Sequence, residues 1–139
     1  LAIVSGYFNP LHKGHIELFH KAKSKADELL VIINSDYQRT LKGSKSFQDE
    51  MERLIIIQNL RVVDHQMVSI DKGTTQCTTL KYLNDRYSLE YDLLFCNGGD
   101  QSNDTIPEYK VCIDNEIKLI DGLGEKVQSS SWLLTNKNK

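Results

Sequence analysis

The stretch GYFNPLHKGH, residues Gly6–His15, combines two histidines, two glycines and a proline within one short segment. It follows the apolar run Leu1–Val4 (LAIV), which is typical of a buried parallel strand. Downstream, apolar residues recur at helical spacing from Ile16. The stretch therefore lies where a strand gives way to a helix, and it places His12 and His15 at that junction.

Strand and helix patterns alternate along the rest of the chain. Continuous apolar runs predict four further strands, at Leu29–Ile33, Val62–Ile70, Asp92–Cys96 and Ile117–Ile120. Helices are predicted from Ile16, at Gln48–Leu60, Thr75–Tyr87 and Tyr109–Glu116, and over Ser129–Leu134, whereas the polar segment Asn34–Ser46 is expected to be a loop. This alternation predicts an α/β fold: a Rossmann-like, doubly wound, five-stranded parallel sheet with helices on both faces, in one domain over residues 1–139.

Residues suited to phosphate binding follow four of the predicted strands. In doubly wound sheets, ligands bind beyond the carboxyl ends of the strands. A helix that starts near His15 presents unpaired backbone N–H groups and a partial positive charge, which favour phosphate. We therefore expect His12 and His15 to bind a nucleoside triphosphate, each through a ring N–H. The same edge is expected to carry Gly6, Gly14, Lys42, Lys45, Gly98, Gly99, Asp100, Ser129, Ser130 and Ser131.

The composition argues against several other classes of protein. The 17 basic and 19 acidic residues give no general attraction to nucleic acid or to an anionic membrane. Three widely spaced cysteines argue against a disulfide framework and a paired metal site, and favour a reducing, cytoplasmic location. No apolar run is long enough to cross a membrane, and no signal peptide is recognisable.

The Gly6–His15 stretch resembles the G-x-F-[DN]-P-x-H-x-G-H signature of the cytidylyltransferase-like family of H-x-G-H nucleotidyltransferases. Further stretches resemble, in the same order, those of glycerol-3-phosphate cytidylyltransferases and of the nucleotidyltransferase domain of ADP-heptose synthases. These are INSD and LKG (Ile33–Asp36, Leu41–Gly43), FQDEMERLIIIQNLRVVD (Phe47–Asp64), DLLFCNGGD (Asp92–Asp100) and QSSSWLL (Gln128–Leu134). The resemblance spans nearly the whole chain.

The resemblance implies a role for each matching residue. His12 and His15 would bind the triphosphate and stabilise charge at the transferred phosphorus. Lys42 or Lys45, with Lys45 slightly favoured, would reach the α-phosphate. Arg53 and Arg61 would lie near the acceptor phosphate and the nucleotide. The implied nucleotide-binding residues are Gly6, Tyr7, Phe8, Asn9, Gly14, Gly98, Gly99, Asp100, Ser129, Ser130 and Ser131.

These features predict an enzyme that moves a nucleoside monophosphate, CMP for preference, from a nucleoside triphosphate to a phosphorylated small molecule such as a polyol or sugar phosphate. Pyrophosphate would leave. Mg²⁺ is expected to bind through the nucleotide phosphates rather than a site made of protein ligands. We also expect a homodimer, because the LIII run in the Gln48–Leu60 helix is more apolar than one core face requires.

Two alternatives stay open at this point. The Asn9-Pro10 pair favours an adenylyltransferase that uses ATP on a heptose phosphate, a mononucleotide, a flavin or pantetheine phosphate. The LKG, RVVD and GGD stretches instead favour the sugar- and polyol-phosphate branch. The second alternative is a non-catalytic nucleotide-binding module, although the chain retains every charged position of the motifs. A class I tRNA synthetase fragment is disfavoured, because the chain is short and lacks a surplus of positive charge.

Overall fold

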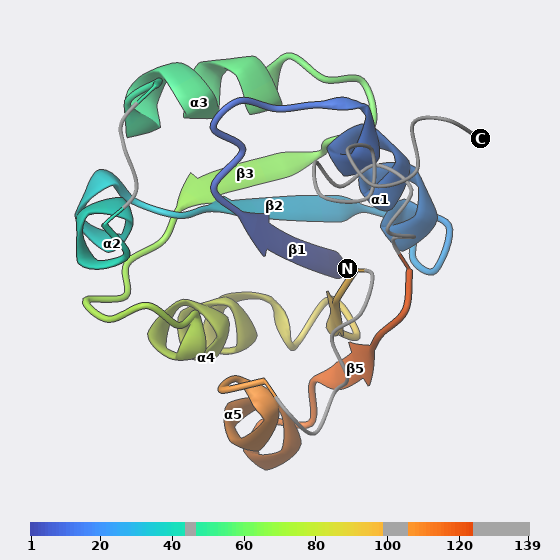
Figure 1. Cartoon of the computed structure of the whole chain (residues 1–139). Helices are drawn as coiled ribbons and strands as arrows, with labels where there is room; N and C mark the ends of the chain where they lie inside the picture. Colours follow the sequence, from blue (N-terminus) through green and yellow to red (C-terminus); the bar gives the residue numbers. More distant parts are fainter. Residues whose placement is uncertain (44–46, 99–105, 124–139) are drawn as a thin grey trace.

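The computed structural model of the chain describes residues 1–43, 47–98 and 106–123, and it contains all five predicted strands (Figure 1). In chain order the elements are β1 (Ala2–Gly6), α1 (Lys13–Lys23), β2 (Leu29–Ile33), α2 (Asp36–Leu41), α3 (Glu50–Gln58), β3 (His65–Val68), α4 (Cys77–Tyr87), β4 (Leu94–Cys96), α5 (Tyr109–Asp114) and β5 (Lys118–Ile120). The predicted helix at Ser129–Leu134 lies outside the described residues.

The five strands form one parallel sheet in the order β3-β2-β1-β4-β5. From β1 the chain adds β2 and then β3 in one direction along the sheet, and it then returns to place β4 on the other side of β1. The direction of winding therefore changes between β1 and β4, and in such sheets the ligand crevice lies at the carboxyl ends of these two strands. The predicted doubly wound α/β fold is confirmed.

Alternate residues of the buried strands pack against different helices. Val4 and Val31 belong to a core with Phe19 of α1 and Ile57 of α3. Ile3, Leu30 and Ile32 point the other way and pack with Leu80 and Leu83 of α4 and Cys112 of α5. Figure 1 shows α3 above the sheet and α4 and α5 below it, while α1, which shares the first core with α3, lies at the right-hand end of the strands in this view. Because both faces of β1 and β2 are covered, their sequences read as continuous apolar runs.

One expectation about the fold is wrong: the segment Asn34–Ser46 is not a loop throughout, because it contains α2. Ser35 caps this helix by accepting a hydrogen bond from the Gln38 backbone N–H at 3.1 Å. The Gln38 side-chain oxygen in turn accepts the Ser35 N–H at 3.0 Å. This reciprocal capping box satisfies N–H groups that the first turn of a helix leaves unpaired.

The three cysteines are free thiols. Cys96 and Cys112 are buried, and burial raises the pKa of their thiols to about 11 and about 12. Both therefore stay protonated at neutral pH.

Candidate active site

The two histidines of the motif form the start of α1. His12 is the N-cap residue, and its Nδ1 accepts the backbone N–H of Gly14 at 3.0 Å. His15 lies in the first turn, and its Nδ1 accepts the backbone N–H of His12 at 3.1 Å. The two rings are stacked, with centroids 3.8 Å apart and planes inclined by 25°. The pair therefore serves as the capping box of the helix.

This hydrogen bonding determines the tautomer of each ring. An Nδ1 atom that accepts an N–H cannot carry a proton of its own, so each neutral ring is protonated on Nε2. Among the described residues, neither Nε2 has a hydrogen-bond partner. Two parallel imidazoles at a helix N-terminus thus each retain one N–H donor that the helix cap does not use.

His15 is held by an aromatic cluster beneath it. The ring of Phe8 lies edge-on to His15, with centroids 5.0 Å apart, and it also contacts Phe19 at 5.4 Å. Burial, followed by the neighbouring His12, lowers the pKa of His15 to about 4. His15 is therefore neutral at pH 7 in the free protein.

Phe8 has a supporting role in the core, and Gly6 both accommodates its ring and lines a pocket. Phe8 is buried in the core, and its backbone has a positive φ of 52°. A Cβ atom on Gly6 would lie 2.8 Å from the Phe8 ring, closer than non-bonded carbons approach. Gly6 is thus required by the packing of Phe8, although it also lines the pocket described next.

A pocket of about 320 Å³ opens at the carboxyl ends of β1 and β4, where the winding of the sheet changes. Gly6 and Phe95 of the two strands contribute to it. Lys42, at the end of α2, lines the same pocket with its Nζ 5.6 Å from the centroid of the Tyr7 ring. Burial raises the pKa of Tyr7, so its hydroxyl stays protonated. The pocket therefore has a cation on its α2 side.

Arg53 does not face this pocket, which corrects its expected role beside a substrate phosphate. Its side chain is fully buried, and Nη1 donates to the backbone oxygens of Tyr7 at 2.8 Å and Asn34 at 2.7 Å. Nε donates to the backbone oxygen of Gln48 at 3.1 Å, and Nη2 pairs with Asp36 at 2.9 Å. Arg53 is a positioning residue that joins the segments following β1 and β2.

Arg61 is also not brought to the histidines. It is exposed in the turn that leads to Asp64, whose carboxylate pairs with Lys23 at 3.1 Å. Lys23 is the last residue of α1, and the histidines are at its first turn, which is about 16 Å away for a helix of this length. Within one chain, Arg61 therefore lies near the amino ends of the strands, whereas the candidate site lies at their carboxyl ends.

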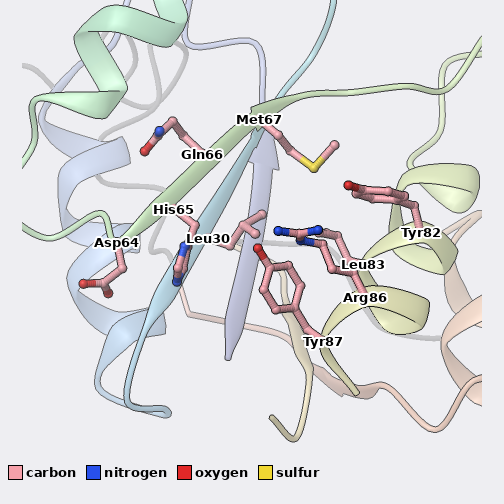
Figure 2. A pocket seen from close by; sticks show the side chains of 9 residues that line it. All are labelled: Leu30, Asp64, His65, Gln66, Met67, Tyr82, Leu83, Arg86 and Tyr87. Atoms are coloured by element: carbon pink, nitrogen blue, oxygen red, sulfur yellow. The ribbon is translucent and has the colours of Figure 1, made fainter. Parts of the chain in front are cut away.

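Another pocket, of about 350 Å³, lies between β3 and α4 and has Asp64 in its lining (Figure 2). Figure 2 shows Arg86 reaching into it beside Tyr87, and the guanidinium carbon lies 5.3 Å from the centroid of that ring. On its other side, His65 Nε2 lies 2.6 Å from Glu28 Oε1. None of the residues predicted for nucleotide transfer lines this pocket, so it is separate from the candidate active site.

The remaining predicted residues fall into two groups. Asn9 lies in the approach to α1, where its side-chain oxygen accepts the backbone N–H of Gln48 at 2.9 Å, and Gly14 donates its N–H to His12. Gly98 is half-buried just after Asn97, a residue of the pocket. Five predicted residues and one predicted lysine lie outside the described residues: Gly99, Asp100, Ser129, Ser130, Ser131 and Lys45.

Three polar residues of the site were not predicted. Gln38 is fully buried and donates to the backbone oxygens of Gly73 at 2.9 Å and Thr75 at 3.0 Å. Gln76 and Glu108 line the pocket, and a Glu108 oxygen accepts the Gln76 backbone N–H at 2.8 Å. The Ser35-x-x-Gln38 spacing could have revealed the first, since it is a capping signature. The other pair spans 32 residues and leaves no local signal.

Comparison with known proteins agrees with this geometry. Residues 3–128 match the family described as cytidylyltransferase-like. The chain belongs to this family. The predicted resemblance is therefore confirmed at the level of the family. Among the helices that the structure describes, none is long and apolar enough to cross a membrane.

Individual relatives carry different activities in their names. The chain is 35% identical over 74 residues to glycerol-3-phosphate cytidylyltransferase of Staphylococcus aureus, a match covering 53% of this chain and 54% of that protein. It is 32% identical over 93 residues to FAD synthase of Thermoplasma volcanium, covering 67% and 65%. It is 41% identical over 66 residues to the bifunctional protein HldE of Rhodospirillum rubrum, covering 46% and 13%. The matches thus span between about an eighth and two thirds of these relatives.

The fold is shared with a solved structure, that of the lipopolysaccharide core biosynthesis protein from Thermoplasma volcanium. The TM-score is 0.66 at 24% sequence identity, and the match covers 86% of this chain and 93% of that one. At this identity the likeness concerns the fold.

The low pKa of His15 predicts a pH-dependent stability. Between about pH 6.5 and pH 4 the unfolded chain binds a proton on this residue that the folded chain does not, so the free energy of unfolding falls as the pH falls. The loss at pH 4 is at most about 3 kcal/mol. In His15→Asn, the side-chain oxygen can still accept the His12 N–H, and this component should disappear. Urea unfolding at pH 7, 6, 5 and 4 measures it, and identical pH profiles for both proteins would contradict it.

The burial of Arg53 predicts a large effect on stability. Arg53→Met should lower the free energy of unfolding by about 3–5 kcal/mol, because it removes the buried ion-pair partner of Asp36 and the side-chain donor of three backbone oxygens. The matched control is Arg61→Met at an exposed position, which should change it by less than about 0.5 kcal/mol. Urea unfolding at 25 °C compares the two, and similar small losses would show that the buried hydrogen bonds are not needed.

Proposed function

We propose that the protein transfers a nucleoside monophosphate from a nucleoside triphosphate to a phosphorylated small molecule, with release of pyrophosphate and with CTP as the preferred donor. The observation that carries this proposal is the stacked histidine pair at the start of α1. Its two Nδ1 atoms are used by the helix cap, which leaves two Nε2–H donors at an end that also favours anions. Membership of the cytidylyltransferase-like family supports the same reaction.

The reaction would be a direct displacement at phosphorus. An oxygen of the acceptor phosphate attacks the α-phosphorus, a new P–O bond forms, and the bond from the α-phosphorus to the oxygen that leaves with pyrophosphate breaks. A phosphate monoester has already lost most of its second proton at neutral pH, so no side chain has to act as the base. Catalysis then depends on alignment and on stabilisation of negative charge.

His12, His15 and Lys42 would supply this stabilisation. With each Nδ1 already accepting a backbone N–H, the two histidines can donate Nε2–H to phosphate oxygens without a change of tautomer. Lys42 brings a positive charge to the acceptor side, in the pocket between β1 and β4. Removal of one preorganised donor of this kind typically costs about 10²–10³ in rate. Lys45, outside the described residues, stays a candidate for the α-phosphate.

Magnesium would enter the site with the triphosphate. Among the described residues, no group of three histidine, cysteine or acidic side chains could hold a metal ion. Mg²⁺ readily keeps its waters and binds phosphate oxygens, so the protein need not provide a cage for it. When bound, it would neutralise part of the charge of the phosphates.

Transfer of AMP to a flavin phosphate is the second candidate. It is favoured by the match to FAD synthase, which covers two thirds of this chain, and by the Asn9-Pro10 pair of the motif. The two candidates share the histidine pair and differ in the nucleotide and the acceptor.

Donor binding and turnover test the proposal. With Mg²⁺ present, thermal unfolding is followed with CTP, ATP, GTP and UTP, and a ligand at about 100 times its Kd should add about 2.7 kcal/mol. Pyrophosphate release is then measured with glycerol 3-phosphate, a heptose phosphate and FMN.

In His12→Asn, the side-chain oxygen can still cap α1 while the Nε2–H is lost, so kcat should fall about 10²–10³-fold. The control is His20→Asn, at an exposed position of the same helix. Unchanged turnover in His12→Asn would overturn the assignment.

We also propose that the protein is a homodimer. Five apolar side chains on α2, α3 and the segment before α3 are largely exposed: Tyr37, Leu41, Phe47, Met51 and Ile55. The two helices are joined where the Asp36 N–H donates to Glu50 at 2.8 Å and the Glu50 N–H donates to Asp36 at 3.1 Å. Exposed apolar side chains gathered on two joined helices are typical of an interface. Light scattering should give the mass of two chains, and Ile55→Glu should give that of one. A monomer mass for the wild-type protein would exclude the dimer.

A further inference from the structure

The side chain of Gln76 has a buried amide oxygen with no hydrogen-bond partner among the described residues. Gln76 is 3% exposed and lines the pocket between β1 and β4. It is the N-cap residue of α4, but its side chain makes no capping hydrogen bond. Buried polar groups are almost always paired, so an unpaired one at a pocket calls for an explanation. A ligand that supplies the missing partner is such an explanation.

The backbone around Gln76 is fixed on several sides. Its own N–H donates to Glu108 at 2.8 Å. Gln38 holds the preceding segment through the backbone oxygens of Gly73 and Thr75. The carboxylate of Asp71 accepts the backbone N–H groups of the following helix turn, at 2.9 and 2.7 Å. The amide therefore stands on a rigid support, and the lack of a partner does not come from a loose loop.

The other residues of the pocket indicate the chemistry of its ligand. Lys42 provides one positive charge, which suits a phosphate. Away from α2, the described polar residues of the lining are mainly neutral, such as Thr74 and Gln76, and Glu108 adds a carboxylate. The volume of about 320 Å³ lies at the lower end of the range for small-molecule sites, about 300–1,000 Å³. A small molecule with a phosphate at one end and hydroxyl groups at the other matches this lining.

We propose that Gln76 determines acceptor specificity by hydrogen bonding to a hydroxyl group of the acceptor, and that the acceptor is a polyol or sugar phosphate. The terminal amide of glutamine turns easily about its last torsion angle, which can bring its oxygen to the pocket. A hydroxyl group both donates and accepts, so it can pair with either the oxygen or the NH2 group of the amide. This inference rests on the proposed nucleotidyl transfer and names the substrate class of that site.

The test compares acceptors that share a phosphate and differ in hydroxyl groups. Glycerol 3-phosphate and ribitol 5-phosphate are compared with propyl phosphate, which lacks hydroxyl groups. FMN, which carries a ribityl chain, is included only to test the flavin alternative. Each acceptor is tried with CTP and with ATP, and pyrophosphate release is measured. Gln76→Leu should lower kcat/KM for the polyol phosphates about 10–100-fold, the effect of losing one buried hydrogen bond. It should leave the KM for the nucleotide and kcat/KM for propyl phosphate within about twofold. Gln58→Leu, at an exposed position on α3, is the matched control.

Two results would overturn the inference while leaving nucleotidyl transfer intact: an equal loss for polyol phosphate and propyl phosphate in Gln76→Leu, or a preference of the wild-type protein for FMN. Absence of pyrophosphate release with every acceptor would instead count against the proposed function. In that case the binding of ribitol 5-phosphate is measured by calorimetric titration. Equal affinities of the wild-type protein and Gln76→Leu for this ligand would overturn the inference. Gln76→Met repeats each measurement if the leucine variant does not fold.

Discussion

One buried guanidinium, that of Arg53, holds together the edge of the sheet on which the candidate site is built. Its donors reach the backbone oxygens of Tyr7, Asn34 and Gln48 and the carboxylate of Asp36. These groups belong to segments that follow different strands, and Arg53 joins all of them through one side chain. Only arginine offers several donors in one rigid plane, and a lysine could not match this set of acceptors.

The rest of the site depends on this arrangement. With the start of α2 fixed through Asp36, the end of α2 places Lys42 over the ring of Tyr7. The buried Gln38 of the same helix then holds the segment that leads to Gln76. Both walls of the pocket are thus positioned by α2, and α2 is itself bonded to the buried Arg53. A site supported in this way is preorganised, so little of the binding free energy is lost in ordering it.

The sequence predicted what depends on local pattern and missed what depends on distant partners. The apolar runs of β1 and β2 and the junction that holds His12 and His15 follow from periodicity and from the order of elements. The role of Arg53 could not be predicted, because a Glu-Arg pair on a helix usually indicates a solvent-exposed face. Its burial comes from acceptors as far as 46 residues away, at Tyr7. Gln76 is similar, since its surroundings are made by Glu108, 32 residues later.

The stacked histidines at the start of α1 have a consequence for how this chain can change over evolution. Each ring uses one nitrogen to begin the helix and keeps the other for a ligand. A substitution that removes the imidazole therefore alters the architecture and the chemistry in a single step, unless the new side chain supplies an acceptor at the position of Nδ1. Selection for folding and selection for activity act on the same two codons, and mutational drift at these positions is limited by whichever demand is stricter.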